Sequence, residues 1–510
     1  MKRKLRKLLI ANRGEIAVRV IRACREQGIA TVAVFSEVDR DALHVQLADE
    51  AHPIGPAPAL ESYLVIDRIL AVARAAGADA IHPGYGFLSE NASFAEACAD
   101  AGVTFVGPPA AAIRAMGSKT AARTIARDLG VPMVPGTLDA LESDAAARTT
   151  AREIGYPVML KAAHGGGGKG MRLVQREEDL AEALRSARAE AGAAFGNAAV
   201  YLERAVIEPR HIEIQVLGDS DGRVIHLGER ECSIQRRHQK LVEECPSSFV
   251  DADLRARMGD AACRVAAAAG YVNAGTVEFL VDAERNFYFL EMNTRLQVEH
   301  PVTEMVTGMD LVAEQLRIAA GEPLSRGQDD VTWRGWAIEC RVNAEDPFAG
   351  WLPSPGTITA LRAPSGPWVR DDSGVYEGYT IPRFYDTLMS KLIVWGADRA
   401  IACDRMARAL AEYRVVGVRT TIPVLERIIA HPDFRAGRLS TAFLERMLPA
   451  VHSNDGRHRD VAILAAVIAE YERGRRAALG APGADGQSAA GHDPRAVAWR
   501  LSGAGTWTGR

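Results

Sequence analysis

The sequence predicts an α/β and α+β multidomain fold, with a parallel α/β domain at the N-terminus. Its 510 residues exceed what one hydrophobic core normally organises. Apolar runs alternate with helical patterns up to about residue 115, as in βαβ units. Beyond that point strands and hairpins predominate. We therefore expect domains over residues 1–115, 116–334 and 335–448, followed by a tail with a flexible linker over 449–510.

The N-terminal elements follow one another as strand, helix and strand. Residues 7–11 form an apolar strand pattern, 15–27 a helix that stops at Gly28, and 31–36 a second strand. A further helix over 62–76 and a strand over 80–82 continue the series. The first junction reads ANRGE, so the dinucleotide fingerprint GxGxxG is absent.

A glycine run dominates the start of the middle segment. Two strand patterns, 157–163 and 171–174, flank the glycines 165–168. Because this loop joins two strands, it is not a Walker A loop, which opens a helix. Glycine backbone N–H groups can still fold over phosphates, so we interpret the loop as part of an ATP lid over about 133–204. The alternative is a hairpin tip with no ligand.

Two acidic residues face each other in a predicted hairpin. Strand patterns over 277–282 and 287–293 are joined by four residues, so paired residue numbers should sum to 569 and place Glu278 opposite Glu291. The opposite face would then pair Val277 with Met292, Phe279 with Leu290 and Val281 with Tyr288.

Two carboxylates about 4 Å apart repel by ~4 kcal/mol at an effective dielectric of 20. A divalent cation relieves this cost, and oxygen-only ligands, with Asn293 on the same side, favour Mg²⁺ or Mn²⁺. Alternatively, one glutamate pairs with an arginine such as Arg295 or faces solvent.

Several basic residues are candidates for binding anions. Lys119 and Lys161 lie in apolar or small-residue contexts, where a phosphate would supply a partner, although an isolated lysine is more often a surface residue that extends its amine to solvent. Arg295 and Glu299 offer a cation and a proton acceptor close together; they could also form an i,i+4 ion pair on a helix. Arg341 shares a strand face with Glu339 and Asn343, which also suits a structural ion pair.

Composition excludes several classes of protein. The net charge of -4 argues against nucleic-acid binding. No stretch approaches the ~20 apolar residues of a membrane span, and the basic N-terminus lacks the apolar core of a signal peptide. The seven cysteines show no CxxC spacing, which argues against a disulfide framework or a zinc site. We expect a cytoplasmic protein without a membrane or nucleic-acid partner.

The motifs together resemble the biotin carboxylase family of ATP-grasp enzymes. They are ANRGEIA, HPGYGFLSEN, MGSK, GGGGKGMR, PRHIEIQVLGD, ERECSIQRRHQK, FLEMNTRLQVEHPVTEM and ECRVNAEDP. The match runs in order from about residue 5 to 447. The resemblance implies an N-terminal α/β domain, an ATP-grasp domain with a mobile lid and a C-terminal α+β domain. It also implies a ligase that carboxylates biotin with ATP and bicarbonate through carboxyphosphate.

The resemblance assigns residues to roles. Those implied to bind ATP are Lys119, Lys161, Gly167, Gly168, Glu203, Arg204, Val206, His211, Gln235, His238, Glu278 and Glu291. Those implied to hold two Mg²⁺ or Mn²⁺ ions are Glu278, Glu291 and Asn293. Those implied to bind bicarbonate or biotin are Lys240, Arg295, Gln297, Val298 and Arg341. Glu299 is the implied general base, and Lys240, Arg295 and Arg341 complete the catalytic set.

The same resemblance implies partners. We find no lysine flanked by methionines in the AMKM manner, so biotin is expected on a separate carrier protein. A carboxyltransferase and a homodimeric state are also implied. The final acceptor, an acyl-CoA such as acetyl-CoA or propionyl-CoA, or pyruvate, stays open. Trp499 and Trp507 suggest that the tail docks a partner. Two rival interpretations are another ATP-grasp ligase that activates a carboxylate, and a silent nucleotide-binding regulatory subunit.

Overall fold

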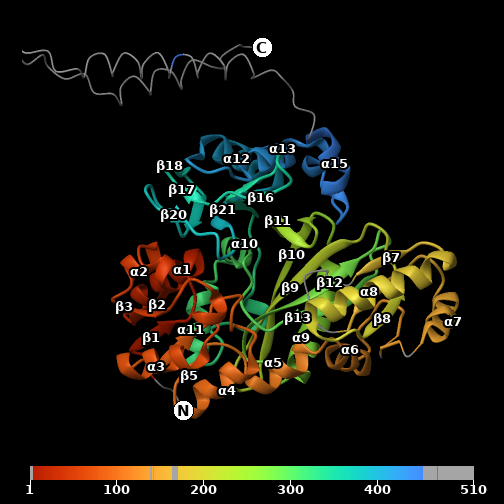
Figure 1. Ribbon diagram of the computed structural model, residues 1–510, viewed down its shortest axis with the longest axis horizontal. Coiled ribbons are helices and arrows are strands. Elements are labelled where there is room, and N and C mark those ends of the chain that lie inside the picture. The colour runs from red at the N-terminus through yellow and green to blue at the C-terminus, as the bar shows by residue number, and fades with distance from the viewer. Residues whose placement is uncertain (1–3, 138–139, 142, 164–170, 452–467, 469–510) are drawn as a thin grey trace, which may run out of the picture. The chain divides into compact units, whose positions relative to one another are not determined.

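The computed structural model describes residues 4–137, 140–141, 143–163, 171–451 and 468 (Figure 1). The chain divides into two units, residues 1–452 and 453–510, and the elements below belong to the first. The predicted glycine loop, with Gly167 and Gly168, lies outside the described residues, as do Trp499 and Trp507 of the tail.

A five-stranded parallel sheet forms the N-terminal part, in the order β3-β2-β1-β4-β5. Its strands are β1 (Lys7–Ile10), β2 (Ala30–Ser36), β3 (Glu50–Gly55), β4 (Ala80–His82) and β5 (Thr104–Phe105). Its helices are α1 (Gly14–Glu26), α2 (Leu43–Leu47), α3 (Ile66–Ala76) and α4 (Ala92–Asp100). Leu8 packs in the core that contains the α1 side chains, while Leu9 enters a second core with Ile69 of α3. Helices therefore cover both faces, and the predicted parallel α/β domain is confirmed.

A long antiparallel sheet follows, in the order β13-β12-β9-β10-β11-β14-β21-β19. Its strands are β9 (Arg210–Gly218), β10 (Val224–Arg236), β11 (Gln239–Cys245), β12 (Asn273–Val281), β13 (Phe287–Asn293), β14 (Trp336–Asn343), β19 (Val369–Ser373) and β21 (Leu388–Gly396). The associated helices are α5 (Ala110–Gly117), α6 (Lys119–Asp128), α9 (Ala252–Ala268), α10 (His300–Thr307) and α11 (Leu311–Ala319). Ile212, Ile214 and Val216 of β9 pack against α9, which leaves the other face of this strand to polar residues.

A separate three-stranded sheet, in the order β7-β6-β8, lies in the region where we expect the lid. The elements of this region are α7 (Asp144–Ile154), β6 (Val158–Ala162), β7 (Arg172–Val174), α8 (Leu180–Phe195) and β8 (Val200–Arg204). Its own core includes Val158, Leu160, Leu184 and Leu202. A satellite core of this kind allows the region to pack as a unit distinct from the long sheet.

The C-terminal part shares the long sheet with the middle of the chain. Strand β11 pairs with β14, so one sheet continues across the expected boundary near residue 335. The remaining strands are β15 (Glu345–Asp346), β16 (Leu352–Pro353), β17 (Gly356–Thr357), β18 (Ala360–Arg362), β20 (Thr380–Ile381) and β22 (Arg414–Val416). The helices are α12 (Arg399–Glu412), α13 (Ile422–Ala430), α14 (Pro432–Arg435) and α15 (Phe443–Val451). The domain boundaries stay a prediction. Among the described residues, no helix is long and apolar enough to cross a membrane.

Candidate active site

The hairpin of β12 and β13 places Glu278 directly opposite Glu291, as predicted. The predicted register fails beyond this pair, because a β-bulge follows Glu278 and Phe279 pairs with Phe289 instead of Leu290. Towards the tip, Val281 pairs with Phe287 rather than with Tyr288. The bulge adds a residue to β13, so Phe287 and Phe289 enter the core while Leu290 stays half-buried.

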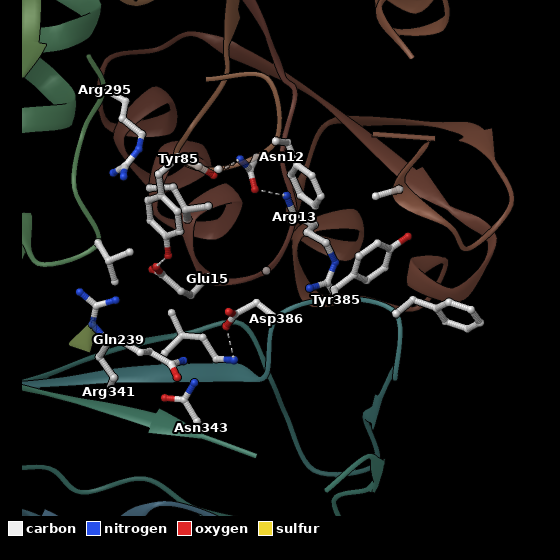
Figure 2. Close-up of a pocket in the computed structure, with 18 residues that line it drawn as sticks. Asn12, Arg13, Glu15, Tyr85, Gln239, Arg295, Arg341, Asn343, Tyr385 and Asp386 are labelled. Atoms are coloured by element: carbon white, nitrogen blue, oxygen red, sulfur yellow. Dashed lines mark hydrogen bonds between the residues drawn. The ribbon is translucent and has the colours of Figure 1, made fainter. Parts of the chain in front are cut away.

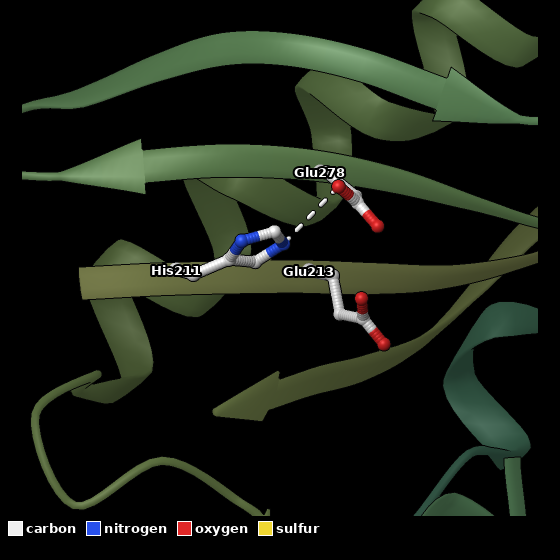
Figure 3. Close-up of side chains that lie close together, drawn as sticks. All are labelled: His211, Glu213 and Glu278. Carbon is white, nitrogen blue, oxygen red and sulfur yellow. Dashed lines mark ion pairs between the residues drawn. The ribbon is translucent and has the colours of Figure 1, made fainter. Parts of the chain in front are cut away.

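Glu278 is the acidic residue around which the polar face of the sheet is organised. One of its oxygens, Oε1, accepts hydrogen bonds from Lys240 at 3.1 Å, Asn293 at 2.9 Å and Gln297 at 3.1 Å. The other lies 3.2 Å from Nε2 of His211, which comes from the adjacent strand β9 (Figure 3). Burial opposes ionisation, but Lys240 and His211 outweigh it and hold the pKa of Glu278 far below its ordinary value.

Lys240 joins three carboxylates into what we call the charged floor, composed of Glu213, Lys240, Glu278, Glu299 and Arg341. Its Nζ lies 2.6 Å from Glu213 and 2.6 Å from Glu299, besides the contact with Glu278. The three strands that supply Glu213, Lys240 and Glu278 are not all neighbours. Strand β10 between β9 and β11 carries three register shifts, and such bulges bend a sheet so that long side chains converge.

Glu299, the predicted base, is fully buried at the end of the loop that leads into α10. Its second carboxylate oxygen accepts a hydrogen bond from Arg341 at 2.8 Å. Burial alone would raise its pKa, but Lys240, Arg341 and Arg230 hold the pKa of Glu299 well below its ordinary value. The carboxylate is therefore ionised and ready to accept a proton, while its cationic neighbours weaken it as a base.

Arg341 is held from both sides. Its Nε donates to Glu243 at 2.6 Å, and Glu243 lies opposite Glu339 in the pairing of β11 with β14. Burial raises the pKa of Glu243 to about 7, against the opposing effect of Arg341. Burial likewise raises the pKa of Glu339 well above its ordinary value, and neither of its oxygens has a hydrogen-bond partner among the described residues. Arg341 thus forms ion pairs with Glu243 and Glu299, which is consistent with the structural alternative as well as with a catalytic role.

Arg295 does not pair with either hairpin glutamate. Its Nε donates to Glu90 at 2.9 Å, and its other nitrogens donate to Gln297 at 2.8 Å and to Asn293 at 3.2 Å. The helical alternative with Glu299 is wrong, because α10 begins only at His300. Glu90, from the turn after β4, orients the guanidinium towards the floor.

The nucleotide side of the site has fewer internal pairs. Lys161 of β6 forms an ion pair with Glu203 of β8, whose other oxygen lies 3.3 Å from Arg123. Lys119, at the start of α6, has no ion pair within 4 Å among the residues that the structure describes. Burial lowers its pKa, and Glu291 opposes that effect. A half-buried amine of this kind fits an anionic ligand.

The other predicted ATP residues lie on the same side of the sheet or at the β8 end. His211 and Gln235 are buried, and His238 sits at the turn between β10 and β11 with a φ of 69°. Burial and the nearby His211 lower the pKa of His238. The exposed Arg204 ends β8, and Val206 follows it.

The donor set of the hairpin fits a hard divalent cation. Burial and then Glu278 raise the pKa of Glu291, which is the electrostatic cost that a bridging cation removes. A second cluster, His211, Glu213 and Glu278, also brings three ligand atoms together (Figure 3), but the Lys240 amine already neutralises it. Asn293 directs its amide nitrogen at Glu278, so the amide must turn to offer its oxygen to the cation.

A cavity of about 530 Å³ adjoins the charged floor. Figure 2 shows Tyr85 and Glu15 on one side of it, Arg295 on another and Arg341 on the strands below. Val298, next to Glu299, also lines it. The volume suits a small organic substrate.

Sequence reasoning missed several residues of this site: Glu15, Tyr85, Glu90, Glu243, Asp372 and Lys391. A signal existed for Lys391, because this lysine interrupts an apolar strand as Lys161 does. The others depend on contacts between segments far apart in the chain.

A parallel N-terminal sheet, a hairpin with paired glutamates and a buried acid–base floor are the arrangement that the resemblance to ATP-grasp enzymes implies. Three family models match in order: biotin carboxylase N-terminal domain over residues 4–113, carbamoyl-phosphate synthase L chain ATP-binding domain over 118–327, and biotin carboxylase C-terminal domain over 339–446.

Similar proteins carry the same family name. A biotin carboxylase of Nostoc sp. is 57% identical over 87% of this chain and 99% of its own length. Biotin carboxylase 1 of Bacillus subtilis is 55% identical over 86% of this chain and 98% of its own length. The biotin carboxylase domain dimer of Hydrogenobacter thermophilus 2-oxoglutarate carboxylase, solved with MgADP, ADP and bicarbonate, matches with a TM-score of 0.85 and 49% identity over 88% of this chain and 99% of that one. The chain belongs to the biotin carboxylase family.

Proposed function

We propose that this chain uses MgATP and bicarbonate to carboxylate biotin that is held on a separate carrier protein. The observation that carries the proposal is Glu299, a buried carboxylate between Lys240 and Arg341. It lies next to Val298, which lines the cavity together with Arg341. A base and two cations at one point suit an anionic substrate that must lose a proton.

The nucleotide would lie between the β6–β8 region and the hairpin. Lys119 and Lys161 supply positive charge for its phosphates, and His211 and His238 stand nearby. Glu278, Glu291 and Asn293 would hold Mg²⁺ or Mn²⁺, which neutralises charge on the transferred phosphoryl group. A second ion between the same two carboxylates is part of the proposal.

Bicarbonate would bind on the charged floor, near Lys240, Arg295, Gln297 and Val298. Its oxygen attacks the γ-phosphorus, forming a new P–O bond while the bond to ADP breaks, and Glu299 accepts the proton of bicarbonate. The product is carboxyphosphate. When Lys240 and Arg341 turn to the incoming anion, the carboxylate of Glu299 loses two stabilising contacts, so its proton affinity rises at the moment of transfer.

Biotin would enter the cavity beside Arg341. Carboxyphosphate breaks into CO₂ and phosphate, the released phosphate accepts the proton of the ureido nitrogen of biotin, and that nitrogen forms the new bond to CO₂. Arg341 and Arg295 stabilise the negative charge on the ureido oxygen during this step.

The partners, the oligomeric state and the location that we propose are those that the family resemblance implies. A carrier protein delivers biotin, a carboxyltransferase uses the carboxybiotin, and the enzyme acts as a cytoplasmic homodimer. The acceptor is an acyl-CoA or pyruvate. We also propose the domain division at about residues 115, 334 and 448.

The direct test supplies free biotin, bicarbonate and MgATP to the purified protein and measures ADP release. We expect release that requires bicarbonate and that biotin accelerates. ADP release that is indifferent to biotin would instead indicate another ATP-grasp ligase, and the absence of nucleotide turnover would indicate a regulatory subunit.

A further inference from the structure

Lys391 is a fully buried cation to which the proposed chemistry gives no role. It lies on β21, and its Nζ donates to the carbonyl oxygen of Val298 at 2.9 Å. The same amine lies 3.2 Å from Glu15 and 4.0 Å from Asp372. A buried lysine requires such partners, because an unpaired charge in the interior is costly.

The three partners come from three separate segments. Glu15 belongs to the first turn of α1, Val298 to the loop between β13 and α10, and Asp372 to β19. One amine therefore links the N-terminal sheet region, the active-site loop and the C-terminal end of the long sheet.

The contact with Val298 bears directly on Glu299. The carbonyl that Lys391 holds belongs to the peptide that joins these two residues. Arg341, which holds the carboxylate of Glu299, lies directly opposite Lys391 in the pairing of β14 with β21. Two neighbouring side chains on adjacent strands thus hold the carboxylate of Glu299 and the carbonyl of the residue that precedes it.

The network also reaches the cavity. The hydroxyl of Tyr85 donates to the Glu15 oxygen that faces Lys391, and Glu15, Tyr85 and Val298 all line the cavity (Figure 2). Lys391 itself does not line it. Any influence on a bound molecule must therefore pass through these neighbours.

We propose that Lys391 is a positioning residue that holds the Val298–Glu299 peptide in place and so sets the position of the Glu299 carboxylate against bicarbonate. This inference rests on the proposed function, since it assumes that Glu299 is the base. A purely structural ion pair would instead affect folding and leave the turnover of the folded enzyme unchanged.

The test uses Lys391→Met in two backgrounds. The single variant leaves Glu15 buried without its cation, so we expect a marked drop in the melting temperature. The double variant with Glu15→Gln removes both charges and should restore much of that drop. Glu15 lines the cavity, so its own substitution can change turnover. The effect of Lys391 is therefore the ratio of kcat in the double variant to kcat in Glu15→Gln alone.

The readouts are the kcat and KM for ATP in bicarbonate-dependent ADP release without biotin, and the same constants with saturating biotin. We expect kcat to fall at least tenfold in both assays, with the KM for ATP within about twofold. The single variant, where folded, should show the same split between kcat and KM. A kcat within twofold of the Glu15→Gln reference would overturn the proposal.

A matched control removes a buried ion pair that lies away from the cavity, Arg399 with Glu244. The Arg399→Met, Glu244→Gln variant should melt at a lower temperature with unchanged kcat. An equal loss of kcat in this control would overturn the positioning role, because general destabilisation would then explain both. Failure of the wild type to respond to biotin would refute the proposed function itself, a result that the variants cannot mimic.

Discussion

The charged side chains at the two ends of the site differ in how they are paired. On the charged floor, Glu213, Glu278 and Glu299 are paired within the protein with three cations, Lys240, Arg341 and Arg230. At the nucleotide end, Lys119 lacks an ion pair among the described residues, and Glu291 faces Glu278 with a raised pKa. The difference indicates that the floor is organised by the fold, whereas the nucleotide end is organised for a polyanion and its metal.

The largest expected effect tests the floor. Glu299→Gln keeps the size of the side chain and removes its ability to accept a proton, so we expect biotin carboxylation to fall by about 10²–10⁴-fold. Nucleotide affinity should change little, because Glu299 lies away from that end. Steady-state kinetics and nucleotide titration measure the two quantities. Glu284→Gln, on the exposed hairpin tip, is the control, and normal turnover by Glu299→Gln would remove this residue as the base.

The two hairpin glutamates should respond in opposite ways to the same substitution. Without metal, Glu291→Gln removes like-charge repulsion and should stabilise the fold by up to about 1 kcal/mol. Glu278→Gln strips a partner from the buried Lys240 and His211, so we expect a loss approaching roughly 3 kcal/mol. Urea unfolding measures both.

Both hairpin variants should also need at least about tenfold more Mg²⁺ for half-maximal activity, which a Mg²⁺ titration of ADP release measures. A pair of variants with equal stability changes would show that the two carboxylates share one environment, contrary to the comparison above.

Lysine substitutions extend the comparison to the cations. Lys119→Met removes a half-buried amine that has no ion pair among the described residues, so stability should be maintained while the KM for ATP rises by about tenfold, equivalent to ~1.4 kcal/mol. Lys240→Met, in contrast, should destabilise the protein, because three carboxylates lose their shared cation. Thermal melts and ATP kinetics separate the two. A stability loss for Lys119→Met as large as that for Lys240→Met would erase the distinction.

The smallest effect concerns protonation beside Arg341. Because burial raises the pKa of Glu339 above its unfolded value of 4.5, the folded state binds a proton that the unfolded state has released. Stability therefore falls as pH rises from about 4.5 through the raised pKa. Glu339→Gln lacks this proton and should lose less stability with pH. The free energy of unfolding is measured from pH 5 to 9 for the wild type and for Glu339→Gln. If the free energies of both proteins changed equally with pH, the expectation would be contradicted.

Sequence periodicity predicted the Glu278–Glu291 pair but not the bulge beside it. The signal was present, since Phe287, Phe289 and Met292 enter the core with spacings of two and then three residues. A strict alternation cannot accommodate that change. The N-terminal parallel sheet was predictable because βαβ units are local patterns.

The partners of the cations were not predictable. Glu243 and Arg341 lie far apart in the chain and meet through the order of strands in the long sheet, whereas Lys391 and Glu15 meet where α1 packs against β21. Strand order depends on tertiary packing that no short window contains. Resemblance to a family supplied the residues, but not which of them neutralise one another.

The β-bulge beside Glu278 also affects how the protein can vary. It separates the hairpin into a half that carries the two glutamates, with pairing fixed from Thr276 to Glu278, and a tip half with its own register. A one-residue change in the tip loop can be absorbed where the two registers meet. Substitutions and insertions at the tip therefore do not change the spacing of the two carboxylates. The loop can vary in sequence while the chemistry is retained.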